Sequence, residues 1–368
     1  MSRDTSVRWA ADPRPLEDVE VDVLIPTRNR AAELAVTLAG LAAQDGPVFR
    51  TVVSDQSDGA PAWIQAPVAA VLRVLEAQGT RVELLRHLPR RGLAEHRQFL
   101  LEQATGEKTL FLDDDVWLEP GALGRMAHAL DELRCGFVGM APQGFSYLKD
   151  RRPEETRSFA AWDGTVAPER VRPAEPAFER WPLHSAANLS HLSVDLGLEP
   201  GQWLAYKVAW LGGCTMFRRA ALEDVGGFRF WTELPPEHCG EDVVAQWNVM
   251  EKYGGAGILP TGAVHLESPT TVTDRRIEAF NVVLGAPGEP GEKESNNHQT
   301  KGTDMDNTPD PIRIQKFLGG VDYPATKDSL LAHAKNAGAD SDVLNALNHI
   351  PETEYDGPTS VSSAVSDG

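Results

Sequence analysis

The sequence predicts an α/β fold: a Rossmann-like, mostly parallel sheet flanked by helices, with a small helical module near the C-terminal end. Two features carry this prediction. Strand-like and helix-like segments alternate from residue 21 to residue 112, as they do in parallel sheets. The strand-like segments end in polar residues, and the carboxyl ends of parallel strands meet at one edge, where binding sites lie. The chain of 368 residues is long enough for one large domain or two ordinary ones.

Each expected element of the first part is bounded by residues that start or stop it. The elements are a strand at 21–25, a helix at 30–44, a strand at 49–54, a helix within 62–79, a strand at 81–87, a helix at 93–106 and a strand at 108–112. Pro26 is expected to stop the first strand, and Leu34, Leu38 and Leu41 share one face of the first helix. Gly106 stands where the C-terminal cap of the third helix belongs.

The second part of the sequence is less regular. Residues 141–205 are rich in Pro, Trp and both signs of charge, and we interpret them as an irregular insertion that faces the substrate. Regular patterns return at 210–228 and at 239–255, where a helix is expected to end at Gly254. The apolar stripe of that helix consists of Val243, Val244, Trp247 and Met250.

Composition divides the chain into three parts. Residues 1–284 form the large α/β domain, and residues 285–312, with almost no large apolar side chains, form a flexible linker. Residues 313–368 form a small helical domain with two amphipathic patterns separated by Gly338. The apolar positions are Leu330, Leu331 and Ala334 in the first pattern and Val343, Leu344 and Leu347 in the second.

Charge and hydropathy exclude several classes of protein. A formal net charge of −19 argues against a nucleic-acid binder, because phosphate neutralisation needs clustered Lys and Arg. The apolar runs are shorter than the ~20 residues of a membrane span, and the first residues lack the apolar core of a signal peptide. We therefore expect a cytoplasmic protein, with peripheral membrane association left open. Cys135, Cys214 and Cys239 have no paired spacing and are expected to be buried free thiols.

The stretch FLDDDVWL, residues 111–118, places three carboxylates after an apolar strand. In an extended segment Asp113 and Asp115 leave the same face, while Asp114 points to the other. Two neighbouring carboxylates tolerate ionisation best beside a divalent cation, so this D-x-D pattern predicts a site for Mn²⁺ or Mg²⁺. A solvated acidic turn, or capping of the next helix, is the alternative.

Other polar residues are expected at the same edge of the sheet. Those that follow the first strand are Pro26, Thr27, Arg28, Asn29 and Arg30. Asp55 ends the second strand, where its carboxylate can accept hydrogen bonds from a nucleobase or ribose. Arg97 lies on the helix before the aspartates and can offset the charge of a diphosphate. Together with a cation on Asp113 and Asp115, these groups predict a nucleoside-diphosphate site.

With these motifs, the chain resembles the family 2 glycosyltransferases of the GT-A fold. The segments that carry the likeness, in the family's order, are VDVLIPTRNRAAELAVTLAGL, VVSDQSD, RGLAEHRQFLLEQATGEKTLFLDDDVWLEPGAL, GGCTMFRRAALEDVGGF and GEDVVAQWNVMEKYG. The resemblance implies a donor such as a UDP- or GDP-sugar, with Asp55 near the base and the D-x-D aspartates at the metal. Asp114 is then expected near the donor ribose or sugar, and Gly213 near the donor sugar or the acceptor.

The sequence departs from the family's pattern at two places. Where the family has two acidic residues and a Gly after the second strand, this chain has Ser54, Asp55 and Gln56. Where the family has Ala-Arg-Asn on the helix before the metal motif, this chain has His96, Arg97 and Gln98. These departures affect the expected contacts with the base more than they affect the expected fold.

Glu241 and Asp242 open a helix, where the helix dipole favours carboxylates, so helix capping is one interpretation. The functional interpretation is that one of them removes the proton of the acceptor hydroxyl. The family resemblance favours the second residue, Asp242. The reaction is then expected to be an inverting displacement.

His265 is either a structural histidine or a third metal ligand, since imidazole suits Mn²⁺. The resemblance to the fold also allows a retaining enzyme that uses His265 as a ligand. A third interpretation, from another class, is a catalytically silent nucleotide-binding scaffold.

The acceptor and the partners are less defined by the sequence. Five tryptophans lie in or near the irregular insertion, Trp162, Trp181, Trp203, Trp210 and Trp231, and we expect one or two of them to line the acceptor site. The acceptor is a glycan, a lipid-linked compound, a peptide or a small molecule. The C-terminal segment resembles a small bacterial domain of unknown function. It is expected to mediate homo-oligomerisation, to bind a partner protein or to have a regulatory role.

Overall fold

The computed structural model describes residues 18–146, 148–149, 151–184, 189–272, 275–285, 324–336, 339, 341–355, 361 and 364–365. The chain divides into two compact units, Met1–Pro290 and Gly291–Gly368, and each is considered by itself. The linker expected at 285–312 lies outside the described residues apart from Gly285, and so does Gly338. The two boundaries drawn from composition remain a prediction.

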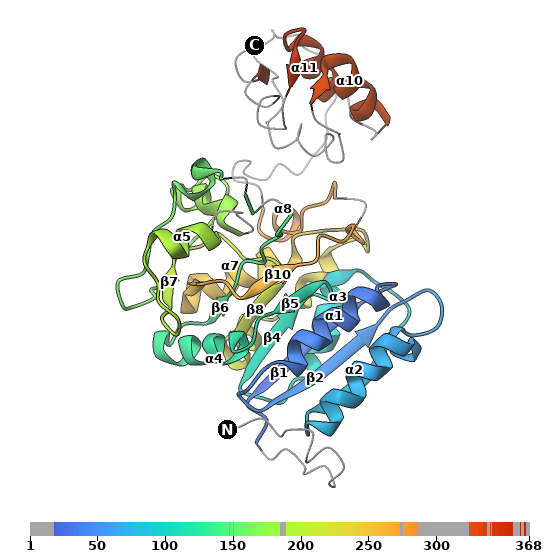
Figure 1. The fold of residues 1–368 in the computed structure, drawn as a ribbon, viewed down its shortest axis with the longest axis vertical. Coiled ribbons are helices and arrows are strands. Elements are labelled where there is room, and N and C mark those ends of the chain that lie inside the picture. The colour runs from blue at the N-terminus through green and yellow to red at the C-terminus, as the bar shows by residue number, and fades with distance from the viewer. Residues whose placement is uncertain are drawn as a thin grey trace, which may run out of the picture. The chain divides into compact units, whose positions relative to one another are not determined.

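The first unit is built on an eight-stranded sheet with the order β3-β2-β1-β4-β8-β6-β9-β7 (Figure 1). Its strands are β1 (Val21–Thr27), β2 (Phe49–Asp55), β3 (Arg81–Arg86), β4 (Lys108–Leu112), β6 (Phe137–Gly139), β7 (Leu204–Tyr206), β8 (Cys214–Arg218) and β9 (Gly255–Leu259). The strands β3, β2, β1 and β4 are parallel, as are β6 and β9, whereas β8 and β7 run antiparallel to their neighbours. This mixed, mostly parallel sheet confirms the predicted α/β class.

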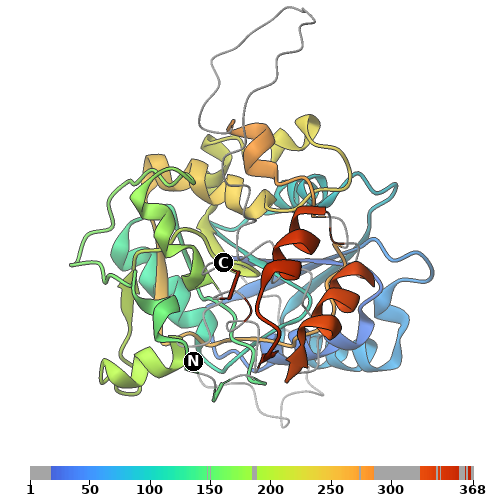
Figure 2. The same ribbon diagram turned by 90° about the horizontal axis from the view of Figure 1, so that it is seen from above.

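Helices cover both faces of this sheet. They are α1 (Ala31–Ala42), α2 (Ala66–Ala77), α3 (Leu93–Glu102), α4 (Ala122–Leu133), α5 (Leu189–Asp195), α6 (Arg219–Asp224), α7 (Glu241–Tyr253) and α8 (Ala279–Val283). Apolar side chains of α1, α2 and α4 share one core, and those of α3, α6 and α7 share the other. In Figure 2, the blue helices α1 and α2 accordingly lie on the opposite side of the sheet from the yellow α7.

The alternation of side chains along the central strands explains the two cores. Val23 and Ile25 of β1 belong to the core under α1, whereas Leu24 between them belongs to the core under α7. In β4, Leu110 and Phe111 divide in the same way. Helices cover both faces of these central strands, so residues on both faces are buried. For this reason the sequence of such a strand is almost continuously hydrophobic.

Most of the elements predicted from the sequence are present, with differences at their ends. The strand β1 runs through Pro26 to Thr27, so the prediction that Pro26 stops it is wrong. Its pairing with β4 ends at Leu24, so beyond that residue β1 pairs only with β2, and a proline without an N–H is tolerated. The helix α3 ends at Glu102, and Gly106 is not its cap, because its amide donates to the buried Asp22 carboxylate instead.

The helix α7 ends where the sequence predicts, with Gly254 as its C-cap at φ 74°. Outside the eight-stranded sheet, β5 (Val116–Leu118) and β10 (Ala263–His265) form a separate antiparallel ribbon. Cys135, Cys214 and Cys239 are buried and free, as predicted. Within the described ranges, no helix combines the length and apolar character required to cross a membrane.

The second unit contains β11 (Ala325–Thr326), α10 (Lys327–Asn336), α11 (Ser341–His349) and β12 (Glu354–Tyr355). Its core includes Leu330, Ala334, Val343, Leu347 and Ile350, all buried. Leu331 and Leu344 pack against this core from partly buried positions. The two apolar faces predicted for the C-terminal helices are therefore confirmed.

Candidate active site

A pocket of about 910 Å³ lies in the first unit, where the loops after β1 and β4 meet the first turns of α3 and α7. It is lined by most of the residues predicted for the site, namely Pro26, Thr27, Arg28, Arg30, Arg97, Asp113, Asp114, Asp115, Gly213, Glu241, Asp242 and His265. Two predicted residues, Asn29 and Asp55, do not line it.

Asn29 and Asp55 shape the loop after β2. The Asp55 carboxylate is fully buried and accepts hydrogen bonds from the amides of Ser57 (2.5 Å) and Ala62 (2.6 Å) and from Arg86 (2.8 Å). The Asn29 side chain donates to Asp58 at 2.7 Å and accepts from the Asp58 amide at 3.0 Å. In this structure the oxygens of Asp55 are therefore already paired with protein donors, away from the pocket.

The three polar clusters after β1, β2 and β4 meet at one edge, as expected. Thr27 Oγ1 donates to Asp114 Oδ2 at 2.7 Å, and Arg30 binds both Asp114 (3.2 Å) and Asp115 (2.6 Å). The side chains of Asp114 and Asp115 are 7% and 6% exposed, whereas that of Asp113 is 36% exposed. Asp113 is thus the carboxylate of the triplet that is most accessible from the pocket.

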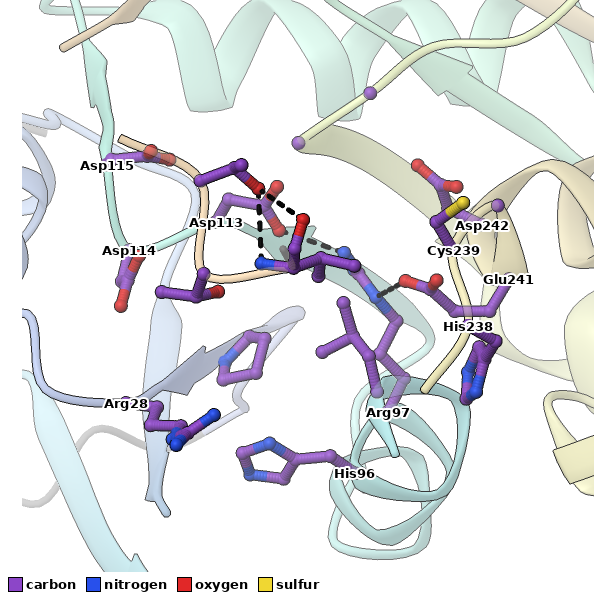
Figure 3. A pocket seen from close by; sticks show the side chains of 18 of the residues that line it. Arg28, His96, Arg97, Asp113, Asp114, Asp115, His238, Cys239, Glu241 and Asp242 are labelled. Atoms are coloured by element: carbon purple, nitrogen blue, oxygen red, sulfur yellow. Dashed lines mark hydrogen bonds and ion pairs between the residues drawn. The ribbon is translucent and has the colours of Figure 1, made fainter. Parts of the chain in front are cut away.

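Burial raises the pKa values of the two inner aspartates. Desolvation raises the pKa of Asp114 to about 7, although the hydrogen bond from Thr27 and the charge of Arg30 oppose this shift. Desolvation also raises the pKa of Asp115, and the neighbouring charge of Asp113 adds to the increase. Asp114 is turned toward β1, away from Asp113 (Figure 3).

Asp115 and His265 are two donors that suit one divalent cation. Register places His265 opposite Val116, and its Nε2 lies 3.4 Å from Asp115 Oδ2, a spacing possible for two ligands of one ion. His265 Nδ1 accepts a hydrogen bond from the Glu267 amide (2.9 Å), so the proton of a neutral ring is on Nε2. Ligation of a cation through Nε2 would require this proton to move to Nδ1 and the hydrogen bond from Glu267 to break. No three such side chains form a ready ligand set among the described residues. Asp113, Asp115 and His265 are therefore of the chemical types that bind a divalent cation. Of these three, Asp115 and His265 also lie close enough together to share one ion.

Arg97 joins the aspartate triplet to α7. Its guanidinium is buried, with Nε donating to Glu241 Oε1 and Nη2 to Asp113 Oδ1, both at 2.9 Å (Figure 3). Burial alone would lower the pKa of Arg97, but Asp113 and Glu241 raise it above its ordinary value. Arg97 thus neutralises carboxylates of the protein, whereas the sequence suggested a role beside a diphosphate.

Asp242 lies in the first turn of α7, half-buried at the pocket wall. Its Oδ1 accepts a hydrogen bond from the Val243 amide at 2.9 Å. Burial and the charge of Glu241 raise the pKa of Asp242 to about 8, and Arg97 opposes the increase. A carboxylate with such a raised pKa can remove a proton from a hydroxyl near neutral pH.

The segment before β8 is fixed to α7 and carries an aromatic side of the pocket. Gln246 exchanges hydrogen bonds with the backbone of Leu211 (2.8 and 2.7 Å). Trp181 and Trp210 line the pocket, and His184 stacks on Trp210 with ring centroids 4.4 Å apart. The other three tryptophans considered above, Trp162, Trp203 and Trp231, do not line it.

Gly213 combines a positive φ with a close approach to the triplet. Its φ is +69°, and a Cβ there would lie 3.1 Å from Asp113 Oδ2. Its carbonyl accepts a hydrogen bond from the Asp113 amide at 2.9 Å. A side chain at this position would push against the carboxylate that faces the pocket.

The pocket also contains residues that the sequence did not single out as site residues. Gln56 and His96 stand next to the predicted Asp55 and Arg97, so their position in the sequence was a usable signal. Residues 236–239 and 268–272 contribute eight further unpredicted lining residues, and these loops have no periodic pattern.

Replacing Arg97 with methionine is expected to lower the free energy of unfolding of the first unit by about 3–5 kcal/mol, because Asp113 and Glu241 would lose their shared cation. Urea unfolding followed by tryptophan fluorescence reports on this unit alone, since every tryptophan precedes Pro290. The exposed Arg81→Met on β3 is the control, with an expected change within about 0.5 kcal/mol. Equal effects of the two substitutions would contradict the bridging role of Arg97.

Comparison with family models identifies two matches. The model described as "Glycosyl transferase family 2" matches residues 22–226, more than half of the chain. The model described as "Protein of unknown function (DUF2795)" matches residues 309–362. No curated protein matches the chain.

Solved structures resemble the chain at low identity. Mannosyltransferase PcManGT from Pyrobaculum calidifontis, in complex with GDP-Man and Mn²⁺, is 19% identical over 73% of this chain and 64% of its own, with a TM-score of 0.44. TarS 1-349 of S. aureus is 17% identical over 65% of this chain and 58% of its own, with a TM-score of 0.41. The chain thus covers less than two thirds of either protein. At these scores the likenesses say nothing of what this chain binds.

Proposed function

The chain belongs to glycosyl transferase family 2, and from this membership we propose that it transfers a sugar from a nucleoside-diphosphate sugar to an acceptor hydroxyl, with inversion. The observation that carries the proposal is the position of Asp242, a half-buried carboxylate in a pocket that also contains the aspartate triplet. In a displacement at a sugar carbon, a general base can activate the acceptor hydroxyl and a metal ion can stabilise the leaving diphosphate. This pocket contains a candidate base and a cluster of aspartates that could hold a metal ion.

In the proposed reaction, Asp242 accepts the proton of the acceptor hydroxyl while that oxygen attacks the anomeric carbon. The bond between this carbon and the diphosphate oxygen breaks at the same time, and the diphosphate leaves with the bonding electrons. Glu241 acts on the protonation of Asp242 through its charge, and its own carboxylate is held by Arg97. These contacts support Asp242, and not Glu241, as the base.

The diphosphate needs positive charge, and Arg28 is the best candidate to provide it. Arg28 lines the pocket, and its buried Nε has no hydrogen-bond partner in the described structure. One terminal nitrogen of the same guanidinium binds Asp58 at 3.3 Å, which holds the side chain in place. Arg30 also lines the pocket, but its guanidinium is already paired with Asp114 and Asp115.

We propose that Asp113, Asp115 and His265 hold a divalent cation, Mn²⁺ or Mg²⁺. When bound, such an ion would neutralise charge on the departing diphosphate. The donor types support this assignment, as does the spacing between Asp115 and His265.

The proposal is tested by measuring nucleoside-diphosphate release from a panel of UDP- and GDP-sugars. We expect the enzyme to turn over at least one of these donors. EDTA treatment should lower the rate roughly 100-fold, and added Mn²⁺ should restore it. Turnover unchanged by EDTA would contradict the cation. Binding of nucleotides without turnover of any donor would favour a catalytically silent scaffold.

The stereochemical outcome separates the inverting from the retaining interpretation. The anomeric configuration of the first product, followed by NMR, should be opposite to that of the donor. Retention would instead support the alternative in which Asp242 is not the base that activates the acceptor.

A further inference from the structure

Arg30 already provides a positive charge to the two inner aspartates. Its side chain is 12% exposed, and Nη1 lies 2.6 Å from Asp115 Oδ2 and 3.2 Å from Asp114 Oδ1. The other terminal nitrogen, Nη2, donates a hydrogen bond to the backbone carbonyl of Pro269. One guanidinium therefore connects the aspartate triplet to residues 266–272, the loop that follows β10.

The 266–272 loop forms part of the pocket wall. Ser268 and residues 270–272 line the pocket. Near the start of the loop, Ser268 Oγ donates to Glu33 Oε1 on α1 at 3.2 Å. The hydrogen bond from Arg30 is a second connection between this loop and the beginning of α1, so a movement of Arg30 would act directly on the pocket wall.

The turn at the start of this loop depends on His265. Glu267 has a φ of +58°, which is uncommon for a residue other than glycine. Its amide donates to His265 Nδ1 at 2.9 Å, and its carboxylate accepts a hydrogen bond from the Ser146 amide at 3.2 Å. The turn is therefore stabilised by the same ring nitrogen that must release the Glu267 amide when Nε2 binds a cation.

A cation at Asp115 and His265 would disturb both of these connections. Asp115 Oδ2 is the oxygen that Arg30 binds, and it is also the oxygen 3.4 Å from His265 Nε2. A divalent ion on this oxygen would share it with the guanidinium, and the two positive charges would repel each other. Ligation by Nε2 would also remove the acceptor of the Glu267 amide. Both consequences act on the 266–272 loop.

We propose that Arg30 is a built-in counter-ion that a divalent cation displaces from Asp115, and that its displacement releases the 266–272 loop. Arg30 is then a positioning residue, which sets the affinity of the site for the cation and couples cation binding to the shape of the pocket wall. A purely structural ion pair would not predict that removing Arg30 strengthens cation binding. This inference rests on the cation site of the proposed function.

The first test measures the dissociation constant of Mn²⁺ by electron paramagnetic resonance, on the full chain without nucleotide. Arg30→Met keeps much of the length of the side chain and removes its charge, so Mn²⁺ should bind about tenfold more tightly than to the unmodified protein. Arg28→Met is the matched control, because it removes the same charge from a guanidinium that binds Asp58, and it should change the constant less than about twofold. Unchanged or weaker Mn²⁺ binding by Arg30→Met would overturn the competition.

The second test follows the loop with an environment-sensitive fluorophore on Thr271→Cys, an exposed position in a chain whose native cysteines are buried. Mn²⁺ should shift the emission, with half of the shift at the dissociation constant found by the first test. Arg30→Lys keeps the charge but lacks the second terminal nitrogen that binds Pro269. Its emission should be shifted already without Mn²⁺, while its affinity for Mn²⁺ stays within about threefold.

Because Arg30→Lys keeps the charge beside the aspartates, it tests the coupling even where Arg30→Met does not fold. Emission that does not respond to Mn²⁺, or that is unshifted in Arg30→Lys, would overturn the coupling to the loop. Absence of Mn²⁺ binding in every variant would overturn the inference as a whole. The proposed transferase activity is judged separately, by turnover of the donor panel with and without EDTA.

Discussion

Replacing Asp242 with asparagine is expected to lower kcat by roughly 10²–10⁴-fold, the usual contribution of a general base. The donor KM should change little, because Asp242 lies apart from the aspartate triplet and meets the acceptor in the proposed reaction. Asparagine keeps the shape of the side chain but cannot take the proton of the acceptor hydroxyl. Initial rates of nucleoside-diphosphate release, with acceptor or with water as the attacking group, measure the effect.

The matched control is Glu251→Gln, an exposed carboxylate near the end of the same helix, which should leave kcat within about twofold. A kcat for Asp242→Asn close to that of the control would show that another group activates the acceptor. An increase in the donor KM alone would instead assign Asp242 to donor binding.

The pH dependence provides a second readout of Asp242. Burial and Glu241 raise its pKa to about 8, and only the deprotonated carboxylate acts as a base. The rate should therefore rise with pH, about tenfold per unit, and level off above pH 8. The residual activity of Asp242→Asn should lack this rise. A rise centred near pH 4 in the unmodified enzyme would contradict the raised pKa.

Local sequence patterns predicted the framework of this site well, because the forces that set it are local. The apolar run at 108–112 became β4 with the expected bounds, since a strand buried on both faces needs an uninterrupted run. The stripe on α7 and the glycine after it predicted both the buried face and the end of the helix. The predicted meeting of the three polar clusters followed from parallel strands ending at one edge.

The partners of the charged side chains were not predictable from sequence spacing. Arg97 and Glu241 are 144 residues apart in sequence and form a buried hydrogen bond. A family pattern names such residues one at a time and does not say which positive charge neutralises which carboxylate. Contact of Asp55 with a nucleotide remains a prediction, and the pattern did not indicate that loop amides and Arg86 donate hydrogen bonds to its oxygens.

The largest effect expected within the aspartate triplet is that of Asp113→Asn, which should lower turnover at least roughly 10²–10³-fold. All three carboxylates line the pocket, and Asp113 is the most exposed of them. Removing its negative charge weakens the proposed cation site and also removes the ion pair between Asp113 and Arg97. When turnover is measured against Mn²⁺ concentration, the variant should need a higher concentration of Mn²⁺ to reach half of its maximal rate.

Asp114→Asn is the matched control for this prediction, because it changes the adjacent residue in the same way. Burial raises the pKa of Asp114 to about 7, so this side chain is already partly protonated at neutral pH and loses less charge on substitution. Its effect on turnover should stay within about tenfold. If the two substitutions lowered turnover equally, without a change in the Mn²⁺ requirement, the triplet would act through loop structure and not through a bound cation.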